Sequence, residues 1–265
     1  MADIWEIYAD DIHYNFKHFY ANWPPNQPIK LGDFGMLEDN LFRRKGNIKG
    51  VFNVDFQTRS GQAQQSDYEY KSAGSTELTF SAKGSSGNPA IPVNASLKID
   101  FSSSDAIFFN AAGCNNDSIE DEVTLGKDIL KLFKDDKWDD DWVIVTNLVT
   151  AGATTVVISS ADAASLSLEA DANISNINLS DASLRLGVKH EKNIGYKVVT
   201  QGGMIPLLGC SKLHRHLFSD PTLDPLSRFA LLPRAATEYE SMTLKQHLKD
   251  EKRPLSDAFH FGRVV

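Results

Sequence analysis

The chain has 265 residues, 42% of them hydrophobic, and a formal net charge of −8. This composition excludes disorder throughout the chain and allows one large domain or two small ones. The acidic balance argues against nucleic-acid binding, because phosphate contacts need a basic surface. No apolar run approaches the roughly 20 residues of a membrane-spanning helix, and the N-terminus lacks the pattern of a secretory signal, so we expect a cytoplasmic protein that is soluble when made.

The first 22 residues carry an aromatic stripe at helical spacing. Its members recur every three or four residues: Trp5, Tyr8, Ile12, Phe16 and Phe19. This spacing predicts an amphipathic helix, which the prolines of "NWPPNQP" end. Two interpretations stay open: a helix docked on a core, or an interfacial membrane helix in which Trp5 and Phe16 contact lipid.

The next region alternates short apolar stretches with Gly, Asn and Asp, which predicts β-hairpins, including a strand with Phe52, Val54 and Phe56 on one face. Within it, "FRRKGNIKG" gathers four basic residues: Arg43, Arg44, Lys45 and Lys49. One interpretation is a solvated hairpin turn. The other is a binding site for acidic phospholipid, since each basic residue near an anionic membrane contributes about 1 kcal/mol.

Two separated pairs of segments alternate apolar and polar side chains, as half-buried strands do. In the first pair, "TELTFSAK" at 76–83 and "VNASLKIDF" at 93–101, the apolar faces consist of Leu78, Phe80, Ala82, Val93, Ala95, Leu97, Ile99 and Phe101. In the second pair, "ASLSLEAD" at 164–171 and "SLRLGVK" at 183–189, they consist of Leu166, Leu168, Ala170, Leu184, Leu186 and Val188. A short connector, "ANISNINLSDA", joins the second pair.

The segment between the two pairs predicts a helix and further strands. Apolar residues at helical spacing predict a helix over about 118–133 with this buried stripe: Ile119, Val123, Ile129, Leu130 and Phe133. The aspartates of "KDDKWDDDW" predict a solvated turn, because their spacing does not fit a calcium loop. "WVIVTNLVTAGATTVVISS" predicts two central strands or one bent hairpin. Residues 214–265, rich in proline, predict a partly docked tail with a helix near 237–250.

No catalytic motif emerges from the chain. The histidines lack metal-ligand spacing, and no phosphate-binding loop or nucleophile elbow occurs. We therefore expect no enzymatic activity, no cofactor and no metal, with Cys114 and Cys210 as buried free thiols. A non-catalytic β-rich binding or scaffold module remains the main alternative to a membrane function, and an enzyme without a recognised motif remains a weaker one.

The order of these features resembles the pore-forming domain of gasdermins: N-terminal helix, basic turn, strand pair, helical middle, a "WVIVTNLV" strand, and a second strand pair. The likeness covers about residues 1–213 and is strongest to the short gasdermin-like proteins of filamentous fungi that control cell death in allorecognition. "DDWVIVTNLVTAG" is similar to a strand of that family, with Asn147 where an acidic residue is commoner.

The resemblance implies an α+β fold, with a twisted antiparallel sheet, long amphipathic hairpins and flanking helices. It also implies a function: a protein that moves from the cytoplasm to the plasma membrane, binds acidic phospholipid, forms a homo-oligomer or a hetero-oligomer with an allelic relative, and inserts its two hairpins as a pore. A transmembrane β-strand needs about 9 to 11 alternating residues, which segment 93–101 provides. Animal gasdermins carry a large inhibitory C-terminal domain, whereas this chain has only the tail at 214–265.

Overall fold

The computed structural model describes residues 3–61, 66–83, 94–170, 177–215 and 259–264. These residues form an α+β protein with mostly antiparallel sheets and a few helices. The expected fold class is confirmed at this level. Among the described residues, three helices flank the sheets: α1 (Ile4–Phe16), α2 (Ile48–Phe52) and α3 (Glu122–Lys134).

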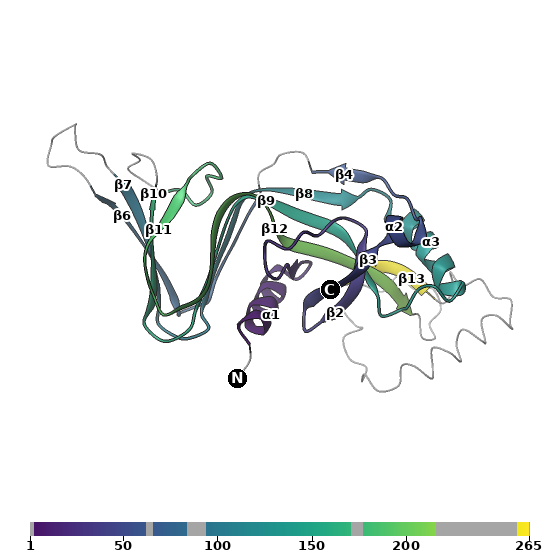
Figure 1. Cartoon of the computed structure of the whole chain (residues 1–265), viewed down its shortest axis with the longest axis horizontal. Coiled ribbons are helices and arrows are strands. Elements are labelled where there is room, and N and C mark those ends of the chain that lie inside the picture. Colours follow the sequence, from purple (N-terminus) through teal and green to yellow (C-terminus); the bar gives the residue numbers. More distant parts are fainter. Residues whose placement is uncertain (1–2, 62–65, 84–93, 171–176, 216–258, 265) are drawn as a thin grey trace.

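Two sheets contain the strands of the described residues (Figure 1). Sheet A has nine strands: β1 (Tyr20–Ala21), β2 (Asp33–Glu38), β3 (Leu41–Asn47), β4 (Thr58–Ser60), β5 (Ser66–Lys71), β8 (Ile107–Ile119), β9 (Val143–Ser159), β12 (Ile194–Arg215) and β13 (Phe259–Arg263). Sheet B has four strands: β6 (Thr76–Lys83), β7 (Asn94–Phe101), β10 (Ala164–Ala170) and β11 (Leu186–Lys192).

Sheet B contains the two predicted strand pairs, but its last strand is shifted: β11 spans Leu186–Lys192 instead of 183–189, because the amide of Ser183 is hydrogen-bonded to Asp181 in a turn, and Leu184 therefore lies in the connector. Each pair is antiparallel, and β7 also pairs with β10, which gives the order β11-β10-β7-β6. In this register Leu97 lies opposite both Phe80 and Leu168. The apolar faces of the two predicted pairs therefore form one continuous apolar face.

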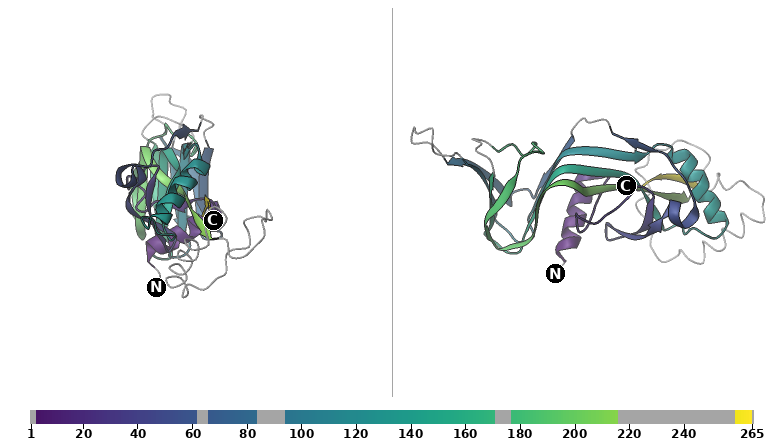
Figure 2. Two further views of the ribbon diagram at one scale, coloured as in Figure 1. Left: turned by 90° about the vertical axis from the view of Figure 1, so that its right-hand side faces the viewer. Right: turned by 45° about the horizontal axis from the view of Figure 1, so that its top comes forward.

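Four short segments, here called the crossings, carry the chain between the sheets: residues 72–75, 102–106, 160–163 and 193. They connect β5 to β6, β7 to β8, β9 to β10, and β11 to β12. The strands joined by the crossings have the same order in the two sheets: β5-β8-β9-β12 in sheet A and β6-β7-β10-β11 in sheet B. Figure 1 and the right view of Figure 2 show the strands turning sharply at the crossings and running back as sheet B.

The helix α1 lies against sheet A, as one of the two interpretations expected. Tyr8 and Ile12 are fully buried in a cluster with Phe109 and Leu207. Burial raises the pKa of the Tyr8 hydroxyl far above its ordinary value. The helix ends at Phe16, so Phe19 of the predicted stripe lies beyond it.

Three local predictions are wrong. Residues 118–119 belong to β8, and α3 starts only at Glu122. The buried face of this helix contains Leu125, Ile129 and Phe133, and Val123 lies outside it, 71% exposed. The segment predicted as two strands is one strand, β9, of 17 residues. The alternation over 52–56 is not a strand, because Phe52 ends α2 and no strand covers 53–56.

The end of the tail forms part of sheet A. Strand β13 pairs antiparallel with β12, and Leu213 lies opposite Phe261. The amide of Val264 donates to the carbonyl of Cys210 at 2.8 Å, which extends this pairing. The predicted helix near 237–250 lies outside the described residues.

Candidate functional site

The basic cluster lies mainly on β3, the strand at one end of sheet A. Three members are consecutive and exposed on this strand: Arg43, Arg44 and Lys45. Their common exposure follows from a β-bulge, because the register of β3 against β2 shifts at Lys45. The turn between β2 and β3 is made by Asp39 and Asn40, both at positive φ. The basic residues therefore follow the turn instead of forming it, and Lys49 lies in α2.

Carboxylates already contact most of these cations. Arg44 Nε lies 3.0 Å from Oδ2 of Asp33, whose side chain is only 1% exposed. Lys49 Nζ lies 2.8 Å from Oδ1 of Asp55, and this hydrogen bond lowers the pKa of the Asp55 carboxyl. Arg43 Nε is 3.8 Å from Oε2 of Glu38, and both side chains are about half exposed. Arg44 consequently stabilises a buried carboxylate, whereas Arg43 remains accessible to another anion.

Aromatic rings lie beside the same cations. The guanidinium of Arg43 is 5.7 Å from the ring centre of Trp5, and Lys45 Nζ is 5.1 Å from that of Trp142. Such cation–π contacts hold a charged side chain against an apolar ring. The structure thus brings together Trp5 and Arg43, which were predicted separately as lipid-binding residues. It also places Trp142 beside this basic strand, and in the sequence only the position of Trp142 next to the acidic turn set it apart.

Phe16 has a different environment. Its ring packs against Phe109 and Tyr68, with ring centres 5.7 Å apart in both cases. It is a partly buried member of the sheet A core in this conformation. A lipid contact of Phe16 requires α1 to leave the sheet.

Sheet B has one apolar and one polar face. Six of the nominated inserting residues in its central strands are 0–2% exposed and belong to one core cluster: Ala95, Leu97, Ile99, Phe101, Leu166 and Leu168. The cluster also contains Phe108 and Val157 of sheet A, so the apolar face is covered by the bent-back sheet. Serine, lysine and acidic side chains occupy the opposite face, among them Ser96, Lys98 and Asp100.

The nominated residues near the edges of sheet B are less covered. Leu78, Leu184 and Leu186 are partly buried and pack against the same cluster. Phe80 and Val188 are 48% and 43% exposed. Val93 lies outside the described residues. The apolar face is therefore dry at its centre and open to solvent at both edge strands.

Each crossing contains one residue in the left-handed backbone region. These residues are Gly74 at φ 71°, Asp105 at 61°, Ala163 at 53° and Asn193 at 54°. Side-chain hydrogen bonds also support the turn: Ser159 Oγ donates to the carbonyl of Ser103 at 2.8 Å and accepts from the amide of Ala106 at 2.9 Å. All four crossings therefore contain a defined turn of the backbone.

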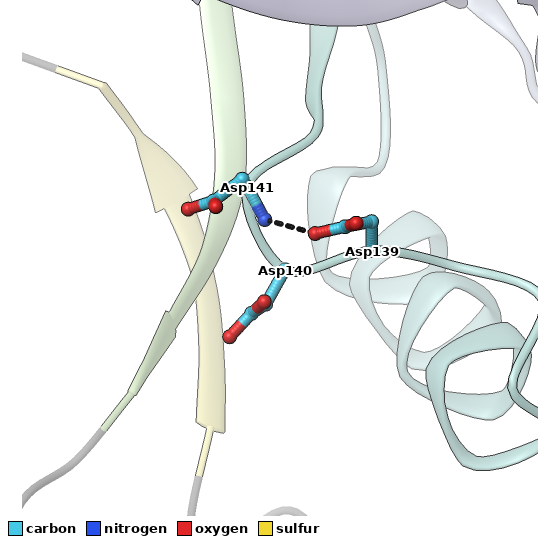
Figure 3. Close-up of side chains that lie close together, drawn as sticks. All are labelled: Asp139, Asp140 and Asp141. Carbon is cyan, nitrogen blue, oxygen red and sulfur yellow. Dashed lines mark hydrogen bonds between the residues drawn. The ribbon is translucent and has the colours of Figure 1, made fainter. Parts of the chain in front are cut away.

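The acidic turn forms a cluster of three carboxylates, Asp139, Asp140 and Asp141 (Figure 3). The amide of Asp141 donates to Oδ1 of Asp139 at 3.0 Å. Asp139 and Asp141 are exposed, and Asp140 is partly buried. This arrangement agrees with the solvated turn that the sequence predicted, and nothing beyond the shared charge points to a ligand.

The two cysteines are free and buried, as expected. Burial raises the pKa of the Cys114 thiol to about 12, so it is protonated at neutral pH. No helix among the described residues is long and apolar enough to cross a membrane.

No protein-family model matches the sequence, and no curated protein matches it.

Proposed function

We propose that this protein is a pore-forming cell-death effector that binds acidic phospholipid membranes, oligomerises and inserts sheet B into the bilayer. It acts without enzymatic chemistry and without a cofactor. The arrangement of the four crossings is the observation that carries this proposal.

The central pair of strands keeps one register through the bend. On the sheet B side Phe101 pairs with Ala164, and on the sheet A side Ile107 pairs with Ile158. Five residues lie between these pairs on each strand, 102–106 and 159–163. Because the two lengths are equal, the bend can straighten into one continuous antiparallel ladder without slipping.

Straightening makes the two faces of sheet B suitable for a bilayer. The face with Leu97 and Leu166 loses its cover from sheet A and needs a new apolar environment, which lipid provides. Lys98 stays in water in both states. Asp105 and Asp162 continue the apolar face by alternation, so the crossings lie at the membrane surface and sheet A remains outside the bilayer.

The basic strand suits the first contact with the membrane. Arg43 and Lys45 are exposed at the end of sheet A, each against an indole ring. Basic side chains attract anionic lipid, and tryptophan favours the interface between water and hydrocarbon.

The gasdermin likeness supplies the finer part of the proposal. We infer a gasdermin-like pore-forming region over residues 1–213 that is cytoplasmic when soluble and moves to the plasma membrane on activation. Its oligomer contains either identical copies or an allelic relative, and its biological role is cell death in allorecognition, that is, heterokaryon incompatibility.

Dye release from liposomes tests the activity. Acidic liposomes should leak in the presence of the protein and neutral liposomes should not. A binding or scaffold module leaves both intact, which would refute the proposal.

Labelled cysteines test the inserted strand. Single cysteines at positions 95–100, in a background without Cys114 and Cys210, carry a polarity-sensitive dye. In leaking liposomes the labels at 95, 97 and 99 should be quenched by lipid-borne quenchers, while those at 96, 98 and 100 should stay wet. Leakage without this alternation would show that β7 does not cross the membrane.

A further inference from the structure

The connector between β10 and β11 is a folded element in its described part, residues 177–185, here called the strap. Asp181 Oδ1 accepts hydrogen bonds from the amide of Ser183 at 2.9 Å and from its hydroxyl at 2.7 Å. The Asp181 amide donates to the carbonyl of Asn178 at 3.0 Å. These turns give the strap a defined shape of its own.

Two side chains of sheet A hold the strap by its backbone. Asn110 of β8, 5% exposed, donates from Nδ2 to the carbonyl of Leu179 at 3.1 Å. Gln201 of β12 donates from Nε2 to the carbonyl of Ser183 at 3.0 Å. The strap belongs to a connector between two strands of sheet B, yet it is hydrogen-bonded to sheet A.

Between these two hydrogen bonds, Ala182 of the strap lies in close contact with two glycines of sheet A. A Cβ atom on Gly113 of β8 would lie 2.6 Å from Cβ of Ala182, and one on Gly152 of β9 would lie 2.8 Å from it. Real Cβ atoms do not approach this closely, so the Ala182 methyl occupies a site that exists only because both positions are glycine. Gly152 has an ordinary backbone conformation, and its lack of a side chain is therefore explained by this contact and not by the turn of the chain.

The strap also packs between the two sheets. Ile177 is 5% exposed, and Leu179 and Leu184 are partly buried against the cluster that covers Leu97 and Leu166. Figure 1 shows this segment beside β11, near the upper end of the space between sheet B and the descending part of sheet A. Opening of the bend must break the contacts that join the strap to sheet A, namely the two hydrogen bonds and the contact of Ala182 with the two glycines.

We infer that the strap is a lock that keeps the sheets bent, and that its release from Gly113 and Gly152 controls how often the bend opens. Its control over pore formation rests on the proposed function. The lock itself is a property of the protein in solution.

The lock is tested by moving one methyl group from residue 182 of the strap to residue 152 of sheet A. Gly152→Ala places a methyl against Ala182 and should displace the strap. Ala182→Gly removes the original methyl, so the double variant Gly152→Ala/Ala182→Gly again has one methyl in the contact and should restore it. This reciprocal rescue separates the strap contact from a general loss of stability.

Spin labels measure opening without a membrane. Thr79 of β6 and Asn115 of β8 are exposed and report the distance between the sheets when replaced by labelled cysteines in a background lacking the native thiols. Gly152→Ala should add a population at longer distance, and the double variant should lose it. Identical distributions in the parent protein and Gly152→Ala, or failure of the double variant to restore the parent distribution, would overturn the inference.

Leakage of acidic liposomes tests the link to the pore. Gly152→Ala should leak about tenfold faster than the parent, equivalent to about 1.4 kcal/mol, and the double variant should return to the parent rate. If the parent protein does not leak, the proposed function fails and the spin-label distances still decide the lock. If the parent leaks and Gly152→Ala opens in solution without leaking faster, strap release does not control the pore.

Discussion

Ala163 offers a direct test of whether the bend opens during pore formation. It is an exposed residue in the crossing between β9 and β10, with φ at 53°. A left-handed conformation costs a residue with a Cβ atom about 1 to 2 kcal/mol, whereas glycine adopts it freely. Ala163→Gly therefore stabilises the bent form by about 1 kcal/mol.

The straightened form does not share this gain. There residue 163 is part of an extended strand, which alanine adopts without strain. The entropy that glycine loses on folding is common to both folded forms, so the substitution favours the bent form over the straightened one by about 1 kcal/mol, or roughly fivefold. Global stability should change little, because glycine also raises the entropy of the unfolded chain by an amount worth about 0.4 to 1 kcal/mol.

The initial rate of dye release from acidic liposomes measures this effect, and a thermal melt gives the stability. We expect Ala163→Gly to leak about fivefold more slowly with a nearly unchanged melting temperature. Ala161→Gly is the matched control, since Ala161 lies in the same crossing but is not among the residues at positive φ. Equal rates for Ala163→Gly and the parent, or equal slowing by the control, would refute the role of the bend.

Three further perturbations test the basic strand, the tail and the strap. Replacing Arg43 and Lys45 by Ala should weaken sedimentation with acidic liposomes about 30-fold at low salt, at about 1 kcal/mol each, with no change on neutral liposomes; unchanged binding by the folded variant removes β3 from the mechanism. Deleting 259–265 should lower the melting temperature by about 5 °C, because β12 loses an edge ladder worth about 2 kcal/mol, and it should leave lipid binding intact; an unaltered melt would mean that β13 contributes nothing to the fold. The hydrogen bonds from Ser183 lower the pKa of the Asp181 carboxyl below its ordinary value of 3.8, so the carboxylate stabilises the strap fully above pH 3.8 and loses this effect only as the pH falls through the lowered pKa. The spin-label distances should therefore be the same at about pH 7 and about pH 5. Opening at about pH 5 would contradict this account.

The sequence predicted β6, β7 and β10 of sheet B in place because their signal is local, whereas β11 lies three residues further along the chain than predicted. Alternation over 93–101 and 164–171 is sufficient to identify a half-buried strand and its apolar face. The joining of the two pairs depends on β7 and β10, whose residues Phe101 and Ala164 are far apart in the chain, and no local pattern encodes that pairing. The bend is hidden for the same reason, since its crossings look like ordinary polar turns.

Glycine and helix phase explain two of the errors. Gly152 looks like a break between two strands, but it lies inside β9 and leaves room for Ala182 of a distant segment. Asp121 caps α3 by accepting from the amide of Thr124, so the helix starts later than predicted. Its buried face contains Leu125, Ile129 and Phe133, which recur every four residues, whereas Val123 lies six residues before Ile129 and about 120° from it around the helix. The first error arises from a tertiary contact and the second from a wrong choice of helix face.

The four crossings also determine how the protein can be divided. Every strand of sheet B continues directly into a strand of sheet A, so no single cut in the chain separates the two sheets. Sheet B is therefore not a domain in the sense of a segment that folds alone, although Figure 1 shows it as a distinct lobe. A fragment of 76–101 would lose β10, and a fragment of 164–192 would lose β7, so neither keeps the central pairing of the sheet. The two lobes should therefore fold and unfold together, as one unit.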